Sequence, residues 1–163
     1  MSEDQQTLVP ADFEVPRSLV AEGFRLEPLG EQHNERDLAA WSGSIAHVRS
    51  TPGFLGKNWP PPEGMSLEAN RADLVRHARD FEARTGFTYS VLEGPGGPDG
   101  SDGDEVIGCL YIYPAKEAPG RIHVSSWVRA DRAPLDVTLY ETVCRWLREV
   151  WPFDAGLIDY APR

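Results

Sequence analysis

Cysteine and lysine are almost missing from this sequence, and long apolar runs are missing altogether. Its 163 residues contain two cysteines, Cys109 and Cys144, and its only lysines are Lys57 and Lys116. The spacing of the cysteines matches no metal or redox motif, so we expect two buried free thiols. The sequence has no apolar run of membrane-spanning length and no N-terminal leader in which an apolar region follows a basic one. It therefore predicts a cytoplasmic protein with no membrane partner.

Positive charge as a whole is scarce. The formal net charge of −10 argues against a broad surface for nucleic acid or anionic lipid, so we expect no nucleic-acid partner. A local group of arginines could still bind one small anion. With 40% hydrophobic and 10% aromatic residues, the chain has the composition of a folded globule. Its length suits one domain with a single core.

Several catalytic and metal-binding motifs are also absent. The sequence has no G-x-S-x-G elbow, no glycine-rich motif for a nucleoside triphosphate or a dinucleotide, and no H-E-x-x-H pair. The acidic stretch GPGGPDGSDGD at 94–104 does not follow the ligand order of a calcium-binding loop. We expect a solvated hairpin connection there and no bound metal.

The sequence does contain clear strand and helix patterns. Apolar side chains alternate in GFRLEPL, whereas Leu67, Leu74 and Phe81 recur every seven residues after the capping residue Ser66. Such patterns predict strands at 23–29, 87–93, 105–114, 121–129 and 156–160, and helices at 33–41, 66–84 and 135–150. Three consecutive strands with short connections predict an antiparallel core, and the strand–helix–strand ending predicts a parallel pair at one side. We expect an α+β domain over residues 19–163, preceded by an N-terminal arm at 1–18.

Two further features of the first half allow more than one interpretation. The Pro/Gly-rich loop at 50–64 carries Phe54 and Trp59, and large apolar residues in a long loop fold back over the molecule. We expect them to cap the core, with the lining of a pocket as the second interpretation. His77 borders the apolar stripe of the helix at 66–84, and we interpret it as a packed or rim histidine rather than a catalytic one.

The order of the elements, together with several local motifs, resembles the GNAT superfamily of N-acetyltransferases. FRLEPL matches the opening strand of that fold, VIGCLYIY its third strand, HVSSWVR its fourth strand and LYETVCRWL the helix that follows. WPPPEGMSLEAN and WLREVWPF are similar to segments of a group of GNAT-like bacterial proteins of uncertain function. The resemblance covers about residues 23 to 160 and implies a mixed, mostly antiparallel sheet flanked by helices on both faces. It also implies that the chain, which ends at Arg163, lacks the last helix and strands of the family.

In this superfamily acetyl-CoA lies where the fourth strand diverges from the fifth, which implies a cofactor site here. The pantetheine would pair with the backbone of Ser126, Trp127, Val128 and Arg129. The pyrophosphate would lie on N–H groups at the start of the next helix. Arg132 is the best match to the Arg or Gln that leads the family's pyrophosphate motif, but the glycines of that motif are missing. Acetyl-CoA or another acyl-CoA is the cofactor that the resemblance implies.

The residues that replace those glycines have unfavourable chemistry for a phosphate. Pro134 has no N–H to donate, and Asp131 and Asp136 bring negative charge. Arg129 and Arg132 could instead grip the phosphates through their guanidinium groups. In the alternative interpretation Pro134 simply starts the helix, Asp136 complements the helix dipole, and the arginines are solvated or paired with the aspartates.

For catalysis, the resemblance draws attention to His123 on the fourth strand. This histidine is best placed to reach the cleft and act as a general base, and a structural histidine on a sheet face is the competing interpretation. Tyr111 and Tyr113 share one face of the third strand, where they either line a pocket or pack into the core. Family members often carry a proton-donating Tyr in the last helix, and no residue here corresponds to it. The N-terminal arm, the Trp59 loop or the second subunit of a homodimer would cover the sheet in place of that helix.

Two functions remain open at this point. The first is an acyl-CoA-dependent N-acyltransferase acting on a small or peptidic amine, with altered or weakened cofactor binding. The second is a non-catalytic GNAT-like module that binds a small molecule or a protein partner. The general activity of the family favours the first function. The glycine-free turn and the short C-terminus favour the second.

Overall fold

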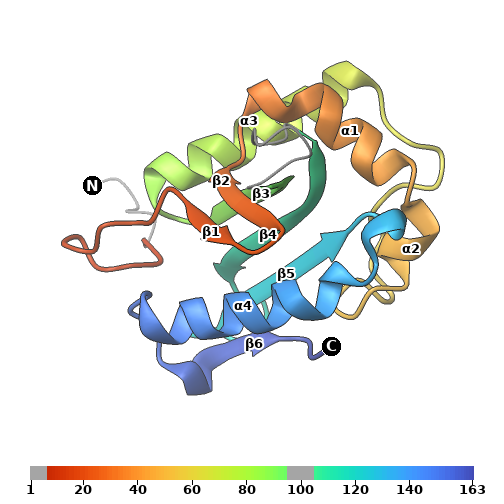
Figure 1. Cartoon of the computed structure of the whole chain (residues 1–163). Helices are drawn as coiled ribbons and strands as arrows, with labels where there is room; N and C mark the ends of the chain where they lie inside the picture. The colour runs from red at the N-terminus through yellow and green to blue at the C-terminus, as the bar shows by residue number, and fades with distance from the viewer. Residues whose placement is uncertain (1–6, 95–104) are drawn as a thin grey trace.

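A computed structural model describes residues 7–94 and 105–163, which form a six-stranded sheet with helices on both faces (Figure 1). The strands lie in sequence order across the sheet. They are β1 (Leu19–Ala21), β2 (Phe24–Pro28), β3 (Phe87–Glu93), β4 (Val106–Pro114), β5 (Ile122–Val128) and β6 (Ile158–Tyr160). Neighbouring strands are antiparallel except β5 and β6, which are parallel. The α+β prediction and the mixed sheet are thus confirmed.

Helices α1 (Asn34–Ser42) and α3 (Leu67–Ala83) lie on one face of the sheet, and α4 (Leu135–Glu149) lies on the other (Figure 1). The short helix α2 (Ile45–Arg49) follows α1 directly. Single 3-10 turns at Glu31–His33, Ala130–Arg132 and Ala155–Leu157 precede α1, α4 and β6. Ser66 caps α3, because its hydroxyl oxygen accepts a hydrogen bond of 3.0 Å from the Ala69 N–H.

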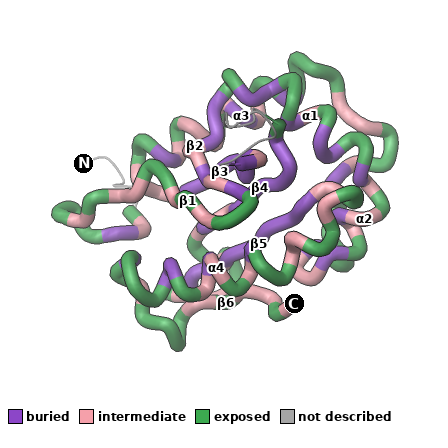
Figure 2. Tube along the Cα trace, in the orientation of Figure 1, coloured by how far each residue is buried: buried purple, intermediate pink, exposed green. Residues whose placement is uncertain are grey.

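The sheet separates two hydrophobic clusters, because successive side chains of a strand point to opposite faces. The cluster on the α4 side joins helix residues such as Leu139, Val143 and Trp146 to the strands. The cluster on the α1 and α3 side contains Trp41, Leu74, Cys109 and Trp127, with Phe54 and Trp59 of the 50–64 loop packed into it. Strands β3, β4 and β5 run through the most deeply buried part of the molecule (Figure 2).

The expected long elements are found, and the differences concern short ones. The sequence patterns did not predict β1 or α2, and the last strand begins at Ile158 rather than at 156. Cys109 is buried, but Cys144 is only partly buried, so the expectation of two buried thiols is half right. The expected hairpin connection at 94–104 lies, apart from Gly94, outside the described residues.

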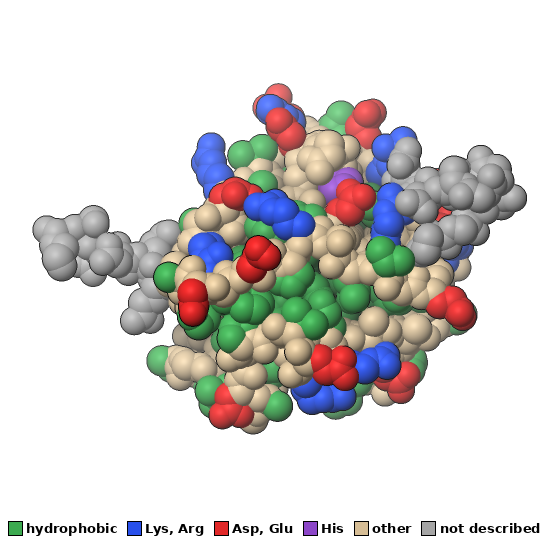
Figure 3. Space-filling model, turned by 60° about the vertical axis from the view of Figure 1, so that its left-hand side comes forward, with side chains coloured by type: hydrophobic (Ala, Val, Ile, Leu, Met, Phe, Trp, Pro, Cys, Tyr) green, Lys and Arg blue, Asp and Glu red, His purple; other side chains and the backbone are tan. Residues whose placement is uncertain are grey.

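The N-terminal arm is in contact with the domain over the residues that the structure describes. The Phe13 and Trp151 rings lie 5.4 Å apart, and the Tyr89 hydroxyl donates a hydrogen bond of 2.7 Å to the Pro16 carbonyl. On the side of the molecule where β1 lies, hydrophobic side chains remain visible between charged ones (Figure 3). These contacts do not test the oligomeric state, so a homodimer stays a prediction. Between residues 7–94 and 105–163, no helix combines the length and the apolar character needed to cross a membrane.

Candidate functional site

The two parallel strands β5 and β6 diverge after three paired residues. Their pairing runs from Ile122 with Ile158 to Val124 with Tyr160, and no later residue of β5 pairs with β6 in the described part of the chain. The Arg129 N–H bonds to a carbonyl of β4. Because backbone groups alternate in direction along a strand, those of Ser126 and Val128 face away from β4, toward the gap. This gap is the place where the resemblance puts the pantetheine.

The Arg163 side chain fills the gap. Its guanidinium donates one hydrogen bond of 2.6 Å to the Ser126 carbonyl oxygen and another of 2.6 Å to Asp136 Oδ2 at the start of α4. Only 2% of the Arg163 side chain is exposed. The Tyr160 hydroxyl, 2.6 Å from Ser126 Oγ, closes the same region from the β6 side. The carbonyl on which a pantetheine would pair is thus already hydrogen-bonded within the protein.

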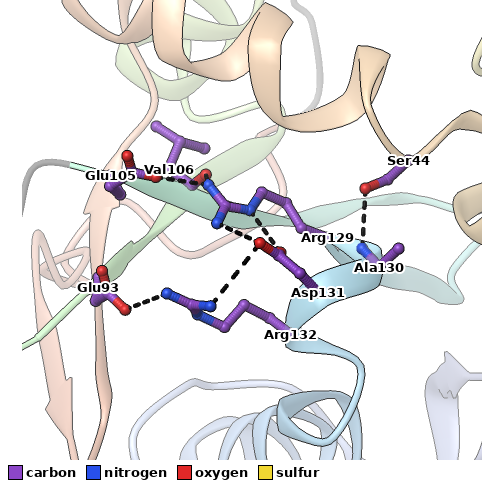
Figure 4. Close-up of polar contacts among 8 residues, drawn as sticks. All are labelled: Ser44, Glu93, Glu105, Val106, Arg129, Ala130, Asp131 and Arg132. Carbon is purple, nitrogen blue, oxygen red and sulfur yellow. Dashed lines mark hydrogen bonds and ion pairs between the residues drawn. The ribbon is translucent and has the colours of Figure 1, made fainter.

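Both arginines of the strand–helix junction are engaged by carboxylates (Figure 4). Arg129 lies 2.9 Å from an oxygen of Asp131 and 2.6 Å from an oxygen of Glu105. Arg132 pairs with Glu93 and lies 3.9 Å from Asp131. Hydrogen bonding to Arg129 lowers the pKa of Asp131. Of the two aspartates in the alternative interpretation, only Asp131 pairs with these arginines, and the other partners are two glutamates that the sequence patterns did not suggest.

These contacts limit how an acyl-CoA fits. Pro134 directly precedes α4 and offers no N–H. Asp136 Oδ1 is buried without a hydrogen-bond partner, and a carboxylate oxygen in that state repels a phosphate. A pantetheine arm would have the edge of β5 available only after Arg163 had moved. The phosphates would then depend on the guanidinium groups of Arg129 and Arg132. The cofactor role of Ser126, Trp127, Val128, Arg129 and Arg132 stays a prediction.

The Trp127 side chain packs into the core on one face of the sheet. Its side chain is fully buried on the α1 and α3 face, and its indole N–H donates a hydrogen bond of 3.0 Å to the Tyr111 hydroxyl. Tyr111 is therefore both a packed residue and a wall of the cavity described next. Burial raises the pKa of its phenol, so the hydroxyl keeps its proton.

Two adjoining cavities open between α3, the 50–64 loop and the strands β4 and β5. The first, here called the aromatic cavity, has a volume of about 270 Å³ and includes the side chains of Asp37, Phe54, Trp59, Tyr111 and Ser125. The second, here called the basic cavity, has a volume of about 610 Å³ and includes Lys57, Lys116, Tyr113 and His123. The two share the walls formed by Arg76, His77 and Tyr111, and together they are here called the cleft. The loop residues Phe54 and Trp59 thus both cap the core and line a pocket.

Asp37 is a buried carboxylate in the wall of the aromatic cavity. It is 5% exposed, and the Asn70 amide donates it a hydrogen bond of 3.1 Å. The same amide donates to Asn34, while the Trp41 indole donates to the Asn70 carbonyl, so the network fixes its members. Burial raises the pKa of Asp37 to about 6, against the opposing effect of the Asn70 hydrogen bond. Asp37 is therefore mostly ionised at neutral pH and can still accept a proton.

His77 is held in one tautomer by its neighbours on β4 and α3. The Tyr113 hydroxyl donates a hydrogen bond of 2.8 Å to Asp80, which as a carboxylate can only accept. His77 Nδ1 lies 2.8 Å from that hydroxyl oxygen and 3.1 Å from Thr88 Oγ1, and since the Tyr113 proton is given to Asp80, we assign the imidazole proton to Nδ1 as a donor to Tyr113. The lone pair is then on Nε2, the other ring nitrogen. Burial lowers the pKa of His77 to about 4, so the ring is neutral at physiological pH.

His123, the histidine favoured by the sequence, lies at the other end of the cleft. It pairs in register with Tyr113 of β4 and lines the basic cavity, which His77 also lines. Burial, followed by the nearby Lys57, lowers the pKa of His123. Its role as a general base stays a prediction. His77, which we interpreted as a packed or rim histidine, is packed and lies in the wall of both cavities.

The sequence patterns missed Asp37 and Arg163. Asp37 lies four residues before the buried Trp41 and three after the buried Asn34 on α1, so helical spacing alone could have placed it inward. For Arg163 no local signal exists, since its contacts join three separate segments of the chain. Among the described residues, no group of three or more His, Cys, Asp and Glu side chains is arranged to hold a metal ion.

Comparison with known proteins defines the class of fold. No model of a protein family matches the sequence, and no curated protein matches it. Solved structures do match. The microcin C7 self-immunity acetyltransferase MccE, in complex with acetyl-CoA and AMP, aligns with a TM-score of 0.58 and 10% identity over 86% of this chain and 68% of its own.

Two ribosomal-protein acetyltransferases are similar to a comparable degree. RimL, the ribosomal L7/L12 α-N-protein acetyltransferase in complex with coenzyme A, has a TM-score of 0.57 and 13% identity over 80% of this chain and 67% of its own. The ribosomal-protein-S5-alanine acetyltransferase from Vibrio fischeri has a TM-score of 0.53 and 11% identity over 80% and 66%. This chain therefore has the fold of the GNAT acetyltransferases, and the fold that the resemblance implied is confirmed.

Proposed function

We propose that this chain is a GNAT-type N-acyltransferase that transfers an acyl group from an acyl-CoA to an amine bound in the aromatic cavity. One observation carries the proposal: the aromatic cavity and the gap between β5 and β6 meet at neighbouring residues of β5. Ser125 lines the aromatic cavity, and the carbonyl of the next residue, Ser126, faces the gap between β5 and β6. The 50–64 loop crosses the same place, since a Cβ on Gly53 would lie 3.8 Å from the Cβ atoms of Ser125 and Ala161.

The walls of the aromatic cavity suit an ammonium group. Phe54, Trp59 and Tyr111 offer ring faces that attract a cation, and the Asp37 carboxylate supplies the opposite charge. An ammonium must lose a proton before its nitrogen can attack a carbonyl. Asp37, with its pKa of about 6, and the lone pair on His77 Nε2 are two proton acceptors in the lining of this cavity. When bound, an acyl-CoA would supply the activated thioester.

The Arg163 side chain has to leave the gap before such a cofactor binds. Its departure would free the Ser126 carbonyl and leave Asp136 without its partner. Cofactor binding by the unaltered protein would therefore be weak, because the loss of this ion pair opposes it. The fold's relationship to acetyltransferases and the open backbone edge of β5 support the proposal.

The test is a calorimetric titration of the protein with acetyl-CoA and with CoA, followed by a thiol-release assay with a panel of small amines. Release of CoA that depends on the amine supports the proposal, and a reaction without amine is the baseline, since Cys144 is itself partly accessible. The Asp37→Asn variant should retain cofactor binding and lose most of the amine-dependent release. Absence of binding at millimolar acetyl-CoA, in both the unaltered protein and the double variant Arg163→Ala/Asp136→Asn, would overturn the proposal.

The second candidate is a GNAT-fold module that binds an amine without catalysis. The nearly complete burial of Arg163 favours it, because a side chain 2% exposed and bonded to two segments is an integral part of the structure. This function predicts that amines bind to the protein, while acetyl-CoA binds neither it nor the Arg163→Ala/Asp136→Asn variant. The same titrations therefore separate the two candidates.

A further inference from the structure

The positive charge around the cleft is concentrated in a way that the composition does not suggest. The chain has a net charge of −10 and only two lysines. Both of them, Lys57 from the 50–64 loop and Lys116 from the turn between β4 and β5, line the basic cavity. Arg76 of α3 lies in the wall between the two cavities. Two distant loops and a helix thus bring cations to one place.

The two lysines have no counter-ion among the residues that the structure describes. Neither forms an ion pair with any residue in 7–94 or 105–163, whereas most arginines there do. Of the acids that line the basic cavity, Asp159 is engaged by Arg121 at 2.6 Å, which leaves Glu117. The basic cavity therefore keeps an excess of positive charge, and an anion would find two uncompensated ammonium groups.

The other end of the cleft has the opposite character. The aromatic cavity contains the carboxylates of Asp37 and Asp73, and only Asp73 has an arginine partner, Arg76 at 3.2 Å. His77 is neutral because burial lowers its pKa to about 4, so it adds no charge to the wall between the cavities. A ligand that lies along this wall meets negative charge at one end and positive charge at the other.

We infer that the molecule bound in the cleft carries an ammonium group and an oxyanion, the ammonium in the aromatic cavity beside Asp37 and the oxyanion in the basic cavity beside Lys57 and Lys116. The inference rests on the proposed function in identifying this molecule with the acyl acceptor. The acceptor is then an amino acid or an amino phosphate rather than a plain amine. The carboxylate of an amino acid and the phosphate of an amino phosphate both carry the negative charge that the lysine ammonium groups bind.

The experiment compares each zwitterion with the amine that lacks its anionic group. Glycine, β-alanine and γ-aminobutyrate are matched with methylamine, ethylamine and propylamine, and phosphoethanolamine is matched with ethanolamine. Binding is measured by calorimetry on the protein without acyl-CoA, at low and high salt. We expect at least one zwitterion to bind about tenfold more tightly than its partner, an advantage that shrinks with salt. Comparison of the amino acids with phosphoethanolamine shows whether the site prefers a carboxylate or a phosphate.

The lysines are tested with a double variant and a matched control. Lys57→Gln/Lys116→Gln should abolish the preference for the zwitterion and leave the affinity for the plain amine unchanged. Arg145→Gln/Arg148→Gln removes the same charge from exposed positions on α4 and should keep the preference. Equal binding of zwitterion and amine, or a preference that survives loss of both lysines, would overturn the inference.

Failure of the inference and failure of the proposed function give different results. Amine-dependent CoA release with no advantage for a zwitterion overturns the inference and keeps the acyltransferase. A lysine-dependent preference for the zwitterion without any CoA binding keeps the assignment of the cleft and overturns the acyltransferase. The two measurements are independent, because the binding experiment contains no cofactor.

Discussion

The Arg163 guanidinium lies 2.6 Å from the Asp136 carboxylate, and in the gap between β5 and β6 it links β5 to the start of α4. A single arginine thereby bonds to the strand that would carry a pantetheine and to the helix that would carry its phosphates. The aspartate is not simply a helix-dipole residue, because its charge is taken up by this partner. The GNAT fold is preserved around this gap, and the Arg163 side chain occupies it.

Replacement of Arg163 should therefore open the gap. In Arg163→Ala/Asp136→Asn the guanidinium and the negative charge of its carboxylate partner are both removed, so we expect acetyl-CoA to bind about tenfold more tightly than to the unaltered protein. The double change is needed because Arg163→Ala alone leaves a partly buried carboxylate without a partner. Calorimetry measures the affinity, and Arg145→Ala, at an exposed position of α4, is the control. Unchanged affinity in the double variant would mean that the gap is not the cofactor site.

Asp37→Asn should change the pH dependence of stability. The pKa of Asp37 is raised from 3.8 to about 6 in the folded protein, so between these values the folded state binds more protons than the unfolded state. The free energy of unfolding therefore falls as the pH rises from about 4 to 6, by on the order of 2 kcal/mol. Asparagine cannot ionise, so the variant should gain stability relative to the unaltered protein as the pH rises through this range.

The measurement is urea denaturation of both proteins at several pH values between about 4 and 8. Glu35→Gln, which removes an exposed carboxylate from the same helix, should leave the pH profile unchanged. If the difference in stability between Asp37→Asn and the unaltered protein is the same at both ends of the range, the carboxylate titrates normally.

Periodicity in the sequence was sufficient for the long elements and insufficient for the site. The stripe of Leu67, Leu74 and Phe81 predicted α3, since a helix of that length is defined by its own spacing. The short strand β1 and the short helix α2 have too few residues for a period, and contacts with the rest of the molecule determine them. The closure of the gap could not be predicted, because it depends on a contact between residues far apart in the chain.

The same limit applies to the junction at 129–136. The sequence showed that glycines are missing and that arginines and aspartates take their place. It did not show that Glu93 and Glu105, from the ends of two other strands, would reach Arg132 and Arg129. Those partners come from the sheet order, in which β4 lies beside β5 and β3 lies next to β4.

Gly86→Ala should displace Tyr113. A Cβ at position 86 would lie 2.1 Å from Cε2 of the Tyr113 ring, far inside contact distance. The ring would have to move, and overpacking of this kind costs about 1–3 kcal/mol of stability. Gly43→Ala is the matched control, because its Cβ would meet only the Ala39 carbonyl oxygen at 3.5 Å. Thermal denaturation of both variants measures the difference, and equal stability would show that Tyr113 is not held by this contact.

His77→Gln should remove a pH-dependent part of the stability at acidic pH. The pKa of His77 is lowered from 6.5 to about 4 by burial, so in this range the unfolded state binds more protons than the folded state. The contribution is fully present above about pH 6.5 and is lost as the pH falls toward 4, by on the order of 2 kcal/mol.

The slope of unfolding free energy against pH should become smaller in His77→Gln and stay unchanged in His47→Gln. Tyr113→Phe, which removes one hydrogen-bond partner of His77 Nδ1 and leaves Thr88 Oγ1 at 3.1 Å, should lower stability by about 1 kcal/mol without abolishing the slope. Urea denaturation gives the slopes, and nuclear magnetic resonance of the imidazole protons gives the pKa of His77 directly. A His77 that titrates near 6.5 would contradict its neutral state in the cleft.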